Sequence, residues 1–163
     1  MAITANGFIA SETHDTPWTD EEWTSYSSKV KEVGNLVVGK VTYDLMINDG
    51  SYDRLGNPTV VCLTTATDTS SVDNHFFVKD FSSATKLLEE RGFAVVLVGG
   101  GGSCDTAALE SGLLDEIYLD IEPILFGKGI PLFRPSRIDL KLQLIDTKKV
   151  GASGVQLHYK VVK

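Results

Sequence analysis

The sequence predicts an α/β domain built on a mainly parallel sheet, with helices on both faces and an antiparallel hairpin at one edge. Strand-like and helix-like segments alternate along most of the chain, which is typical of parallel strands joined by crossover helices. Two segments at the C-terminal end alternate apolar and polar residues around Gly-Ala-Ser-Gly, which predicts the hairpin. The 163 residues, 42% of them hydrophobic, fit one domain spanning residues 1–163.

The N-terminal half of the chain begins with a strand stub and a capped helix. Residues 1–4 are expected to form the strand and residues 16–34 the helix. Thr19 has the chemistry of an N-cap, Glu22 completes a capping box, and Gly34 ends the helix. The segments that follow are expected to be a strand at 35–39, a helix at 41–47, a turn-rich loop at 48–58 and strands at 59–64 and 75–79.

The C-terminal half continues the alternation before it ends in the hairpin. A helix is expected from Ser82, as N-cap, to Gly92, as C-cap. The run at 94–98 predicts a strand buried on both faces. Pro123 indicates an edge or a bulge in the strand that contains it. The remaining elements are expected to be a helix at 104–112, a strand at 115–126 and the hairpin strands at 140–150 and 154–162.

Composition and charge exclude several classes of function. A formal net charge of -7 argues against binding to nucleic acid, although a few backbone N–H groups can still hold a small phosphate. The apolar runs are far shorter than the ~20 residues of a membrane helix, and no secretory leader is expected. Cys62 and Cys104 have no metal-ligand spacing, so we expect free thiols, no metal site and a cytoplasmic location.

Four consecutive glycines, Gly99 to Gly102, directly follow an apolar strand and precede a helix that starts near Ser103. This arrangement is typical of a phosphate site, because the first N–H groups of the helix point outward and its dipole favours an anion. A tight turn that needs positive φ explains the glycines equally well. The run is neither a Walker loop nor a dinucleotide fingerprint, because the required lysine and the distant acidic residue are missing.

A second strand end carries a similar pattern in VVGKVTYD. Gly39 closes the strand, and Lys40 and Thr42 occupy the first turn of the next helix. A cation and a hydroxyl beside unpaired N–H groups favour an anion. A solvated lysine and a capping threonine are the alternative. Two such sites at the carboxyl ends of neighbouring strands suit a ligand with several phosphates, such as a dinucleotide.

Four segments make a resemblance to a known family specific. They are ITANGFIA, VVGKVTYD, VVLVGGGGS and GLLDEIYLDIEPILFGKGIPLF, in this order along nearly the whole chain. Together they resemble the reductase domain of bacterial riboflavin biosynthesis enzymes, a branch of the dihydrofolate reductase-like family. The last segment is the most specific of the four.

The resemblance implies a three-layer α/β/α sandwich that binds NADPH at the carboxyl edge of its sheet. Dihydrofolate reductases carry a cis peptide bond in the corresponding glycine pair, so the Gly99–Gly100 bond is expected to be cis. The segment IEPILFG is a dimer surface in the family, which predicts a homodimer. The pyrophosphate would be held by Gly39, Lys40, Thr42, Gly99, Gly100, Gly101, Gly102 and Ser103.

The chain departs from the family pattern at the expected catalytic centre and beyond the third predicted strand. Asn6 stands where the family has an aspartate, and an amide can orient a substrate but cannot donate a proton as an acid. Glu122 is the candidate substitute, with a water molecule as the alternative. Thr65 stands where the family often has arginine for the 2′-phosphate. Thr64 and Thr65 can still hydrogen-bond a phosphate or a ribose, so NADPH is expected, with NADH as the alternative. The first strand is expected to be shorter than in the family.

Three functions remain open at this point. The first is an NAD(P)H-dependent reductase of a pyrimidine- or pteridine-type heterocycle, similar to 5-amino-6-(5-phosphoribosylamino)uracil reductase. The second is a dihydrofolate reductase, although the helix at 16–34 has no clear pterin-binding carboxylate. Glu21 and Glu22 are the candidates for that role, and capping explains Glu22 better. The third is a non-catalytic dinucleotide-binding module. The chain has no zinc deaminase signature, and its histidines are scattered, so no catalytic triad is expected.

Overall fold

The computed structural model describes residues 1–66 and 72–163. Its helices and strands follow one another as β1 (Ala2–Thr4), β2 (Phe8–Ser11), α1 (Asp20–Val33), β3 (Asn35–Gly39), α2 (Lys40–Asn48), α3 (Ser51–Arg54), β4 (Thr59–Leu63), β5 (His75–Val78), α4 (Phe81–Glu90), α5 (Gly102–Glu110), β6 (Glu116–Glu122), β7 (Gly129–Pro131), β8 (Lys141–Val150) and β9 (Gly154–Val162). The alternation of strands and helices followed by a hairpin is therefore present as predicted.

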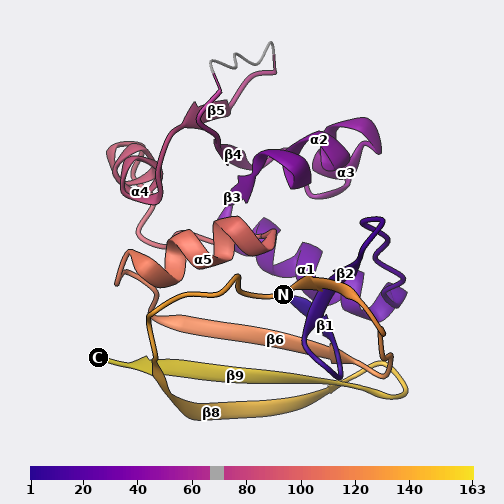
Figure 1. Ribbon diagram of the computed structural model, residues 1–163. Coiled ribbons are helices and arrows are strands. Elements are labelled where there is room, and N and C mark those ends of the chain that lie inside the picture. Colours follow the sequence, from indigo (N-terminus) through magenta and orange to yellow (C-terminus); the bar gives the residue numbers. More distant parts are fainter. Residues whose placement is uncertain (67–71) are drawn as a thin grey trace.

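The strands form two main groups, which Figure 1 shows one above the other. The upper group has the order β3-β4-β5 and is parallel throughout. The lower group has the order β1-β6-β9-β8, with β1 parallel to β6 and the other pairs antiparallel. The chain between Leu97 and Gly100 links the groups, because it pairs with β3 on one side and lies against Met1 on the other.

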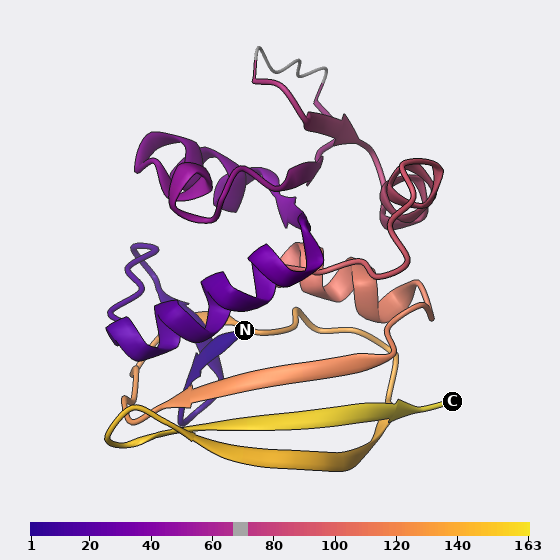
Figure 2. The same cartoon turned by 180° about the vertical axis from the view of Figure 1, so that it is seen from behind.

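Helices cover both faces of the parallel strands, so the predicted three-layer α/β/α class is confirmed. One core contains Val30 of α1, Tyr43 of α2 and Tyr52 of α3, packed on Leu36 and Val60. The opposite core holds side chains of α4 and α5, packed on the other face of β3 and β4. Figures 1 and 2 show α1 and α5 on opposite sides of the molecule. Alternating apolar residues in strands with two covered faces produce this pair of cores.

Several predicted boundaries are confirmed, and three are wrong. Thr19 caps α1 by accepting a hydrogen bond from the Glu22 N–H, and Gly34 ends that helix in the left-handed conformation. Ser82 is not the N-cap of α4. Asp80 is, because its carboxylate accepts from the Ser83 N–H while Phe81 becomes the first helical residue and is buried. The C-cap of α4 is Arg91 and not Gly92, because the helix ends at Glu90. The predicted loop at 48–58 contains the short helix α3.

The segment at 94–98 is not the strand that its apolar run predicts. Only a single bridge, between Val37 and Val98, joins it to the sheet, and Val95 is 59% exposed. The fully buried Asn35 side chain makes hydrogen bonds to this segment that a paired strand would otherwise make. Its Nδ2 donates to the Val95 carbonyl (2.7 Å), and its Oδ1 accepts from the Leu97 N–H (3.1 Å). One amide side chain thus fixes the approach to the glycine run.

Replacing Asn35 by alanine is expected to lower the free energy of unfolding by about 2–4 kcal/mol, because both backbone groups at Val95 and Leu97 lose their partners. Urea unfolding followed by far-UV circular dichroism measures this loss. Asn48, exposed at the end of α2, is the matched control, and its alanine variant should stay within about 0.5 kcal/mol of the parent. Equal effects at the two positions would contradict the bracing function of Asn35.

The remaining differences lie around the lower sheet. β6 is an inner strand that ends at Glu122, so Pro123 follows the strand and marks neither an edge nor a bulge. β1 has three residues and is short, as expected. The antiparallel pair of β2 and β7 was not predicted from the sequence. Both cysteines are free and buried, and among the described residues no helix has the length and apolar character to cross a membrane.

Candidate active site

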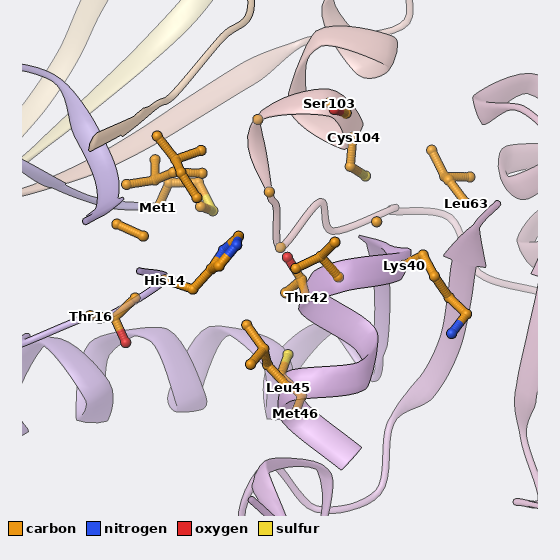
Figure 3. Close-up of a pocket in the computed structure, with 18 of the residues that line it drawn as sticks. Met1, His14, Thr16, Lys40, Thr42, Leu45, Met46, Leu63, Ser103 and Cys104 are labelled. Carbon is orange, nitrogen blue, oxygen red and sulfur yellow. The ribbon is translucent and has the colours of Figure 1, made fainter. Parts of the chain in front are cut away.

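A cavity of about 1300 Å³ opens where β3 and β4 end and the glycine run begins. Figure 3 shows its central part, with Thr42 at the start of α2, Ser103 and Cys104 at the start of α5, and His14 entering from the loop after β2. Of the predicted cofactor residues, nine line this cavity: Gly39, Lys40, Thr42, Thr64, Thr65, Gly99, Gly101, Gly102 and Ser103. The structure therefore brings the two strand ends together, as their positions in a parallel sheet require.

Two helix N-termini face this cavity without a side chain to cap them. α2 starts after Gly39 and α5 after Gly101, and neither has a side-chain capping hydrogen bond. In contrast, α1 and α4 are capped by Thr19 and Asp80. The two ends adjoin, because the Gly39 N–H donates to the Gly100 carbonyl (2.8 Å). Uncapped first-turn N–H groups attract anions, and two adjacent sets suit a diphosphate.

Close packing against the chain's own atoms explains most of the glycine run. A Cβ at Gly99 would lie 2.6 Å from Leu36 Cδ1, and one at Gly102 would lie 2.6 Å from the Pro131 carbonyl oxygen. Gly100 has a φ of +98° and does not line the cavity. The positive-φ explanation thus holds for Gly100, while Gly101 and Gly102 bring backbone to the cavity wall.

The cis peptide bond joins Gly100 to Gly101, one residue later than the expected Gly99–Gly100 bond. Pairing with β3 accounts for the shift. The Gly99 N–H donates to the Val37 carbonyl (2.9 Å), and the Gly100 carbonyl accepts from Gly39. The chain therefore keeps a strand-like path through Gly99 and turns toward α5 from Gly100, whose φ is +98°.

The two predicted polar side chains of α2 differ in what they offer a ligand. The Thr42 hydroxyl lies beside the glycine run, since a Cβ at Gly101 would be 3.3 Å from Thr42 Oγ1, and Figure 3 shows it pointing that way. The Lys40 ammonium lies 2.7 Å and 2.8 Å from the two carboxylate oxygens of Asp44. Thr42 is therefore positioned for a phosphate oxygen, whereas Lys40 already has a carboxylate partner.

One end of the cavity has an aromatic lining and a buried carboxyl group. Trp18, Trp23 and Tyr26 line it together with Glu22, whose side chain is only 4% exposed. Burial, and then the nearby Asp120, raise the pKa of Glu22 from 4.5 to about 7. Glu22 therefore holds a proton in a substantial fraction of molecules at neutral pH, which is the property of a proton donor.

The two predicted catalytic residues lie outside the cavity wall. Asn6 braces the chain, because its Oδ1 accepts from Thr4 Oγ1 (2.8 Å) and its Nδ2 donates to the Phe126 carbonyl (2.7 Å). Glu122 is 1% exposed, and its Oε1 accepts from Thr19 Oγ1 (3.0 Å). Since Thr19 lines the cavity, Glu122 stands one side chain behind the wall.

Sequence reasoning missed Glu22 as a site residue because its position three residues after Thr19 predicts a capping function. The helix does begin at that cap, but the carboxyl group of Glu22 is turned into the cavity. The available signal for a site residue was that Glu22 precedes the aromatic residues Trp23 and Tyr26 by one and four positions on the same helix. Within the described ranges, no set of three or more His, Cys, Asp or Glu side chains is arranged to hold a metal ion.

Comparison with known protein families shows to which family the chain belongs. The model of the RibD C-terminal domain matches residues 1–156. The chain belongs to the RibD C-terminal domain family. Among curated relatives of this RibD C-terminal domain protein, the uncharacterized protein YwjB of Bacillus subtilis is 27% identical over 165 residues, which cover 98% of this chain and 94% of YwjB.

Solved structures share the RibD C-terminal domain fold. A pyrimidine reductase-like protein from Corynebacterium diphtheriae superimposes with a TM-score of 0.77 at 16% identity, covering 99% of this chain and 90% of the other. The diaminohydroxyphosphoribosylaminopyrimidine deaminase/5-amino-6-(5-phosphoribosylamino)uracil reductase of Thermotoga maritima gives 0.73 at 16% identity, covering 99% of this chain and 55% of the other. At such identities the likeness establishes the fold.

Proposed function

We propose that the protein is an NAD(P)H-dependent reductase that acts on a pyrimidine- or pteridine-type heterocyclic substrate, as a 5-amino-6-(5-phosphoribosylamino)uracil reductase does. The hydride goes to a C=N bond, or to a sugar carbonyl that is present as an imine. The observation that carries the proposal is the pair of uncapped helix N-termini, α2 and α5, that meet at one large cavity. This arrangement fits a dinucleotide pyrophosphate. The family match supports the reductase class.

The residues present fit a dinucleotide at its centre. The backbone at the start of α2 and α5 would bind the pyrophosphate, together with the hydroxyls of Thr42 and Ser103, which both line the cavity. When bound, the reduced nicotinamide would supply the hydride. The protein supplies the orientation of the two reactants and the exclusion of water.

The aromatic end of the cavity fits the heterocycle and supplies the proton. Flat ring surfaces pack well against Trp18, Trp23 and Tyr26. Reduction of a C=N bond by hydride leaves a nitrogen that needs a proton, and Glu22 carries one at its raised pKa of about 7. The Asn6 side chain donates a hydrogen bond to the Phe126 carbonyl and so holds the chain in place. We therefore assign the role of proton donor to Glu22.

Dihydrofolate reduction is the second candidate, and one observation favours it. Glu22 places a buried carboxyl group of helix α1 in the cavity wall. The sequence predicts no clear carboxyl group of this kind, and that expected absence argues against a pterin substrate. A carboxyl group next to a flat aromatic site binds the paired N–H donors of an aminopyrimidine edge. A phosphoribosylaminopyrimidine and dihydrofolate share that class of ring, so an assay must separate them.

The assay has two stages. Quenching of protein fluorescence by NADPH and by NADH tests cofactor binding, and absorbance at the nicotinamide band then follows oxidation with each heterocycle. Turnover with the phosphoribosylaminopyrimidine alone supports the first candidate, and turnover with dihydrofolate alone supports the second. Dinucleotide binding without turnover on either would favour a non-catalytic module, and no binding at all would refute the proposal.

We infer that two copies of the chain associate through the exposed edge of the lower sheet. β8 is an edge strand, and Leu142, Leu144 and Ile145 on it are 41%, 52% and 49% exposed. No helix crosses β8 in Figure 1 or Figure 2. Residues 142–145 carry no charge, so two copies of a chain of net charge -7 can meet there without like-charge contacts. Leu125, in the segment similar to a family dimer surface, is 73% exposed.

Replacing Leu144 by glutamate is expected to separate the dimer, because it places two carboxylates in an apolar contact. Light scattering after size exclusion should give about 35 kDa for the parent and the single-chain mass of 17.7 kDa for the variant. Glu89 on α4 offers a control that keeps the fold and the dimer when changed to glutamine. A parent mass equal to one chain at micromolar concentration would refute the association.

A further inference from the structure

Charged side chains are unevenly distributed along the cavity wall. The aromatic end is formed by the start of α1 and by the end of α2 with the turn that follows it, and it is lined by the carboxyl groups of Asp20, Glu22 and Asp49. Residues 16–26 and 45–51, which contribute this end and all belong to the described chain, include no lysine, arginine or histidine. The charge that borders the proposed heterocycle position is therefore negative.

The positive charges of the cavity wall lie at other positions. Lys40 begins α2, and its ammonium already pairs with a carboxylate of that helix. The Arg134 Nε donates to the hydroxyl of Ser103 at the start of α5 (2.6 Å), and Lys79 follows β5. His14 reaches the wall from the loop after β2, as Figure 3 shows. Lys40 and Arg134 thus lie at the helix starts that form the pyrophosphate position, where a negative ligand is expected.

Asp49 is held at the aromatic end by its neighbours. Its Oδ1 accepts from the Ser51 N–H (2.9 Å), and its Oδ2 lies 3.6 Å from Arg54 Nη2. The Arg54 guanidinium lies over the Trp23 ring, 4.9 Å from the ring centroid, and does not line the cavity. Asp49 is therefore fixed next to the aromatic wall, and Arg54 pairs with it from outside the cavity lining.

A phosphate group at the aromatic end would be repelled. It carries about 1.5 to 2 negative charges at neutral pH, and the carboxylates of Asp20 and Asp49 oppose its approach. The amino groups of a pyrimidine or pteridine ring have the opposite complementarity, because their N–H groups donate hydrogen bonds to carboxylates. Trp18 and Trp23 pack against the flat face of the same ring.

We propose that the substrate of this chain is an amino-substituted pyrimidine or pteridine that carries no phosphate group. The carboxyl groups of Asp20, Glu22 and Asp49 select for ring N–H donors and against a phosphate. This inference rests on the proposed function, because it takes the aromatic end as the position of the heterocycle. The chemistry stays that of the proposed reductase, and the substrate differs from a phosphoribosylaminopyrimidine by the missing phosphate.

Calorimetry with one ring in two forms tests the inference without turnover. The phosphoribosylaminopyrimidine and the ribosylaminopyrimidine that lacks its phosphate are each titrated into the parent chain. Saturating NADP⁺ is present, so that the phosphate cannot enter the pyrophosphate position instead. The form without phosphate should bind at least about tenfold more tightly. Added salt should narrow this difference by strengthening the binding of the phosphorylated form, because salt screens the repulsion between exposed charges.

Asp20→Asn and Glu21→Gln form a matched pair of variants. Both residues lie in the first turn of α1 and each change removes one negative charge, but only Asp20 lines the cavity. D20N should bind the phosphorylated form about threefold more tightly than the parent does and leave the other form unchanged. E21Q should match the parent with both forms.

Several results would overturn the inference. The first is a parent chain that binds the phosphorylated form as tightly as the other form, or more tightly. The second is an E21Q variant that acts like D20N. The third is a His14→Gln variant that loses affinity for the phosphorylated form alone, because that loss would make His14 a phosphate ligand of the substrate.

The same titrations separate failure of the inference from failure of the proposed function. If NADP⁺ binds and the two forms bind equally well, only the inference falls. If NADP⁺ binds and neither form binds, the heterocyclic substrate class and the inference fall together. If NADP⁺ and NADPH do not bind the parent chain, the proposed function falls and the inference with it.

Discussion

Replacing Glu22 by glutamine is expected to lower kcat with the heterocyclic substrate about 100-fold, at the lower end of what a general acid contributes. Glutamine fills the same volume in the cavity wall beside Trp23 but has no acidic proton to deliver. Affinity for NADPH should change less than about twofold, because the pyrophosphate position is formed by the starts of α2 and α5. Stopped-flow oxidation of NADPH and fluorescence titration measure the two quantities separately.

The pH dependence should identify the same group. The pKa of Glu22 is raised to about 7, so the parent should lose activity as the pH rises through 7 and the carboxyl group loses its proton. The E22Q variant should keep a low, flat profile across that range. Glu21→Gln is the matched control, since Glu21 is the exposed neighbour on α1 and does not line the cavity. A parent-like profile in E22Q would exclude Glu22 as the proton donor.

The raised pKa of Glu22 also affects the stability of the fold. The resulting change of stability with pH has the opposite sign to that of a salt-bridged acid. The folded protein binds the proton more tightly than the unfolded chain, in which the pKa is near 4.5. The stabilisation is complete below about pH 4.5 and is lost as the pH rises to 7. Urea unfolding at pH 5 and pH 8 should show a larger loss of stability for the parent than for E22Q.

Replacing Gly102 by alanine is expected to destabilise the protein by about 3 kcal/mol, at the upper end of the usual cost of overpacking. The added Cβ would lie 2.6 Å from the carbonyl oxygen of Pro131, which is backbone and cannot move aside as a flexible side chain would. Alanine is the better helix former by about 0.5–1 kcal/mol, and the steric conflict outweighs that gain.

The conflict at Gly102 also displaces the start of α5, so dinucleotide affinity should fall together with stability. Thermal unfolding and fluorescence titration of the same sample test both effects. Gly127→Ala is the control, because nothing lies within 4 Å of its Cβ position and its φ is not in the left-handed region. Parent-like stability of G102A would mean that α5 and β7 are not in close contact.

Local chemistry in the sequence was sufficient to predict the order of elements. The cap at Thr19 and the stop at Gly34 depend on neighbouring residues only, and both are confirmed. The β-branched runs predicted β3 and β4, and the alternation of apolar and polar residues on both sides of residues 151–153 predicted the hairpin. Those patterns are readable because short-range hydrogen bonding and periodicity produce them directly.

Tertiary packing decided what local patterns could not. The apolar run at 94–98 has a strand's composition, but the distant Asn35 side chain takes the place of the pairing that would have made it one. The glycine run looked like a ligand cradle, while its first and last members are required by contacts with Leu36 and Pro131. Such contacts join residues far apart in the chain, so no window of sequence contains them.

The sequence by itself therefore determined the fold class and the two strand ends that meet at the cavity, because parallel strands deliver their carboxyl ends to one edge. Only the tertiary structure decided which carboxyl group faces that cavity. Glu22 and Glu122 are both buried acids, and helix α1 turns the first into the cavity wall while Thr19 separates the second from it. Burial beside Asp120 then raises the pKa of Glu22, and that environment exists only in the folded chain.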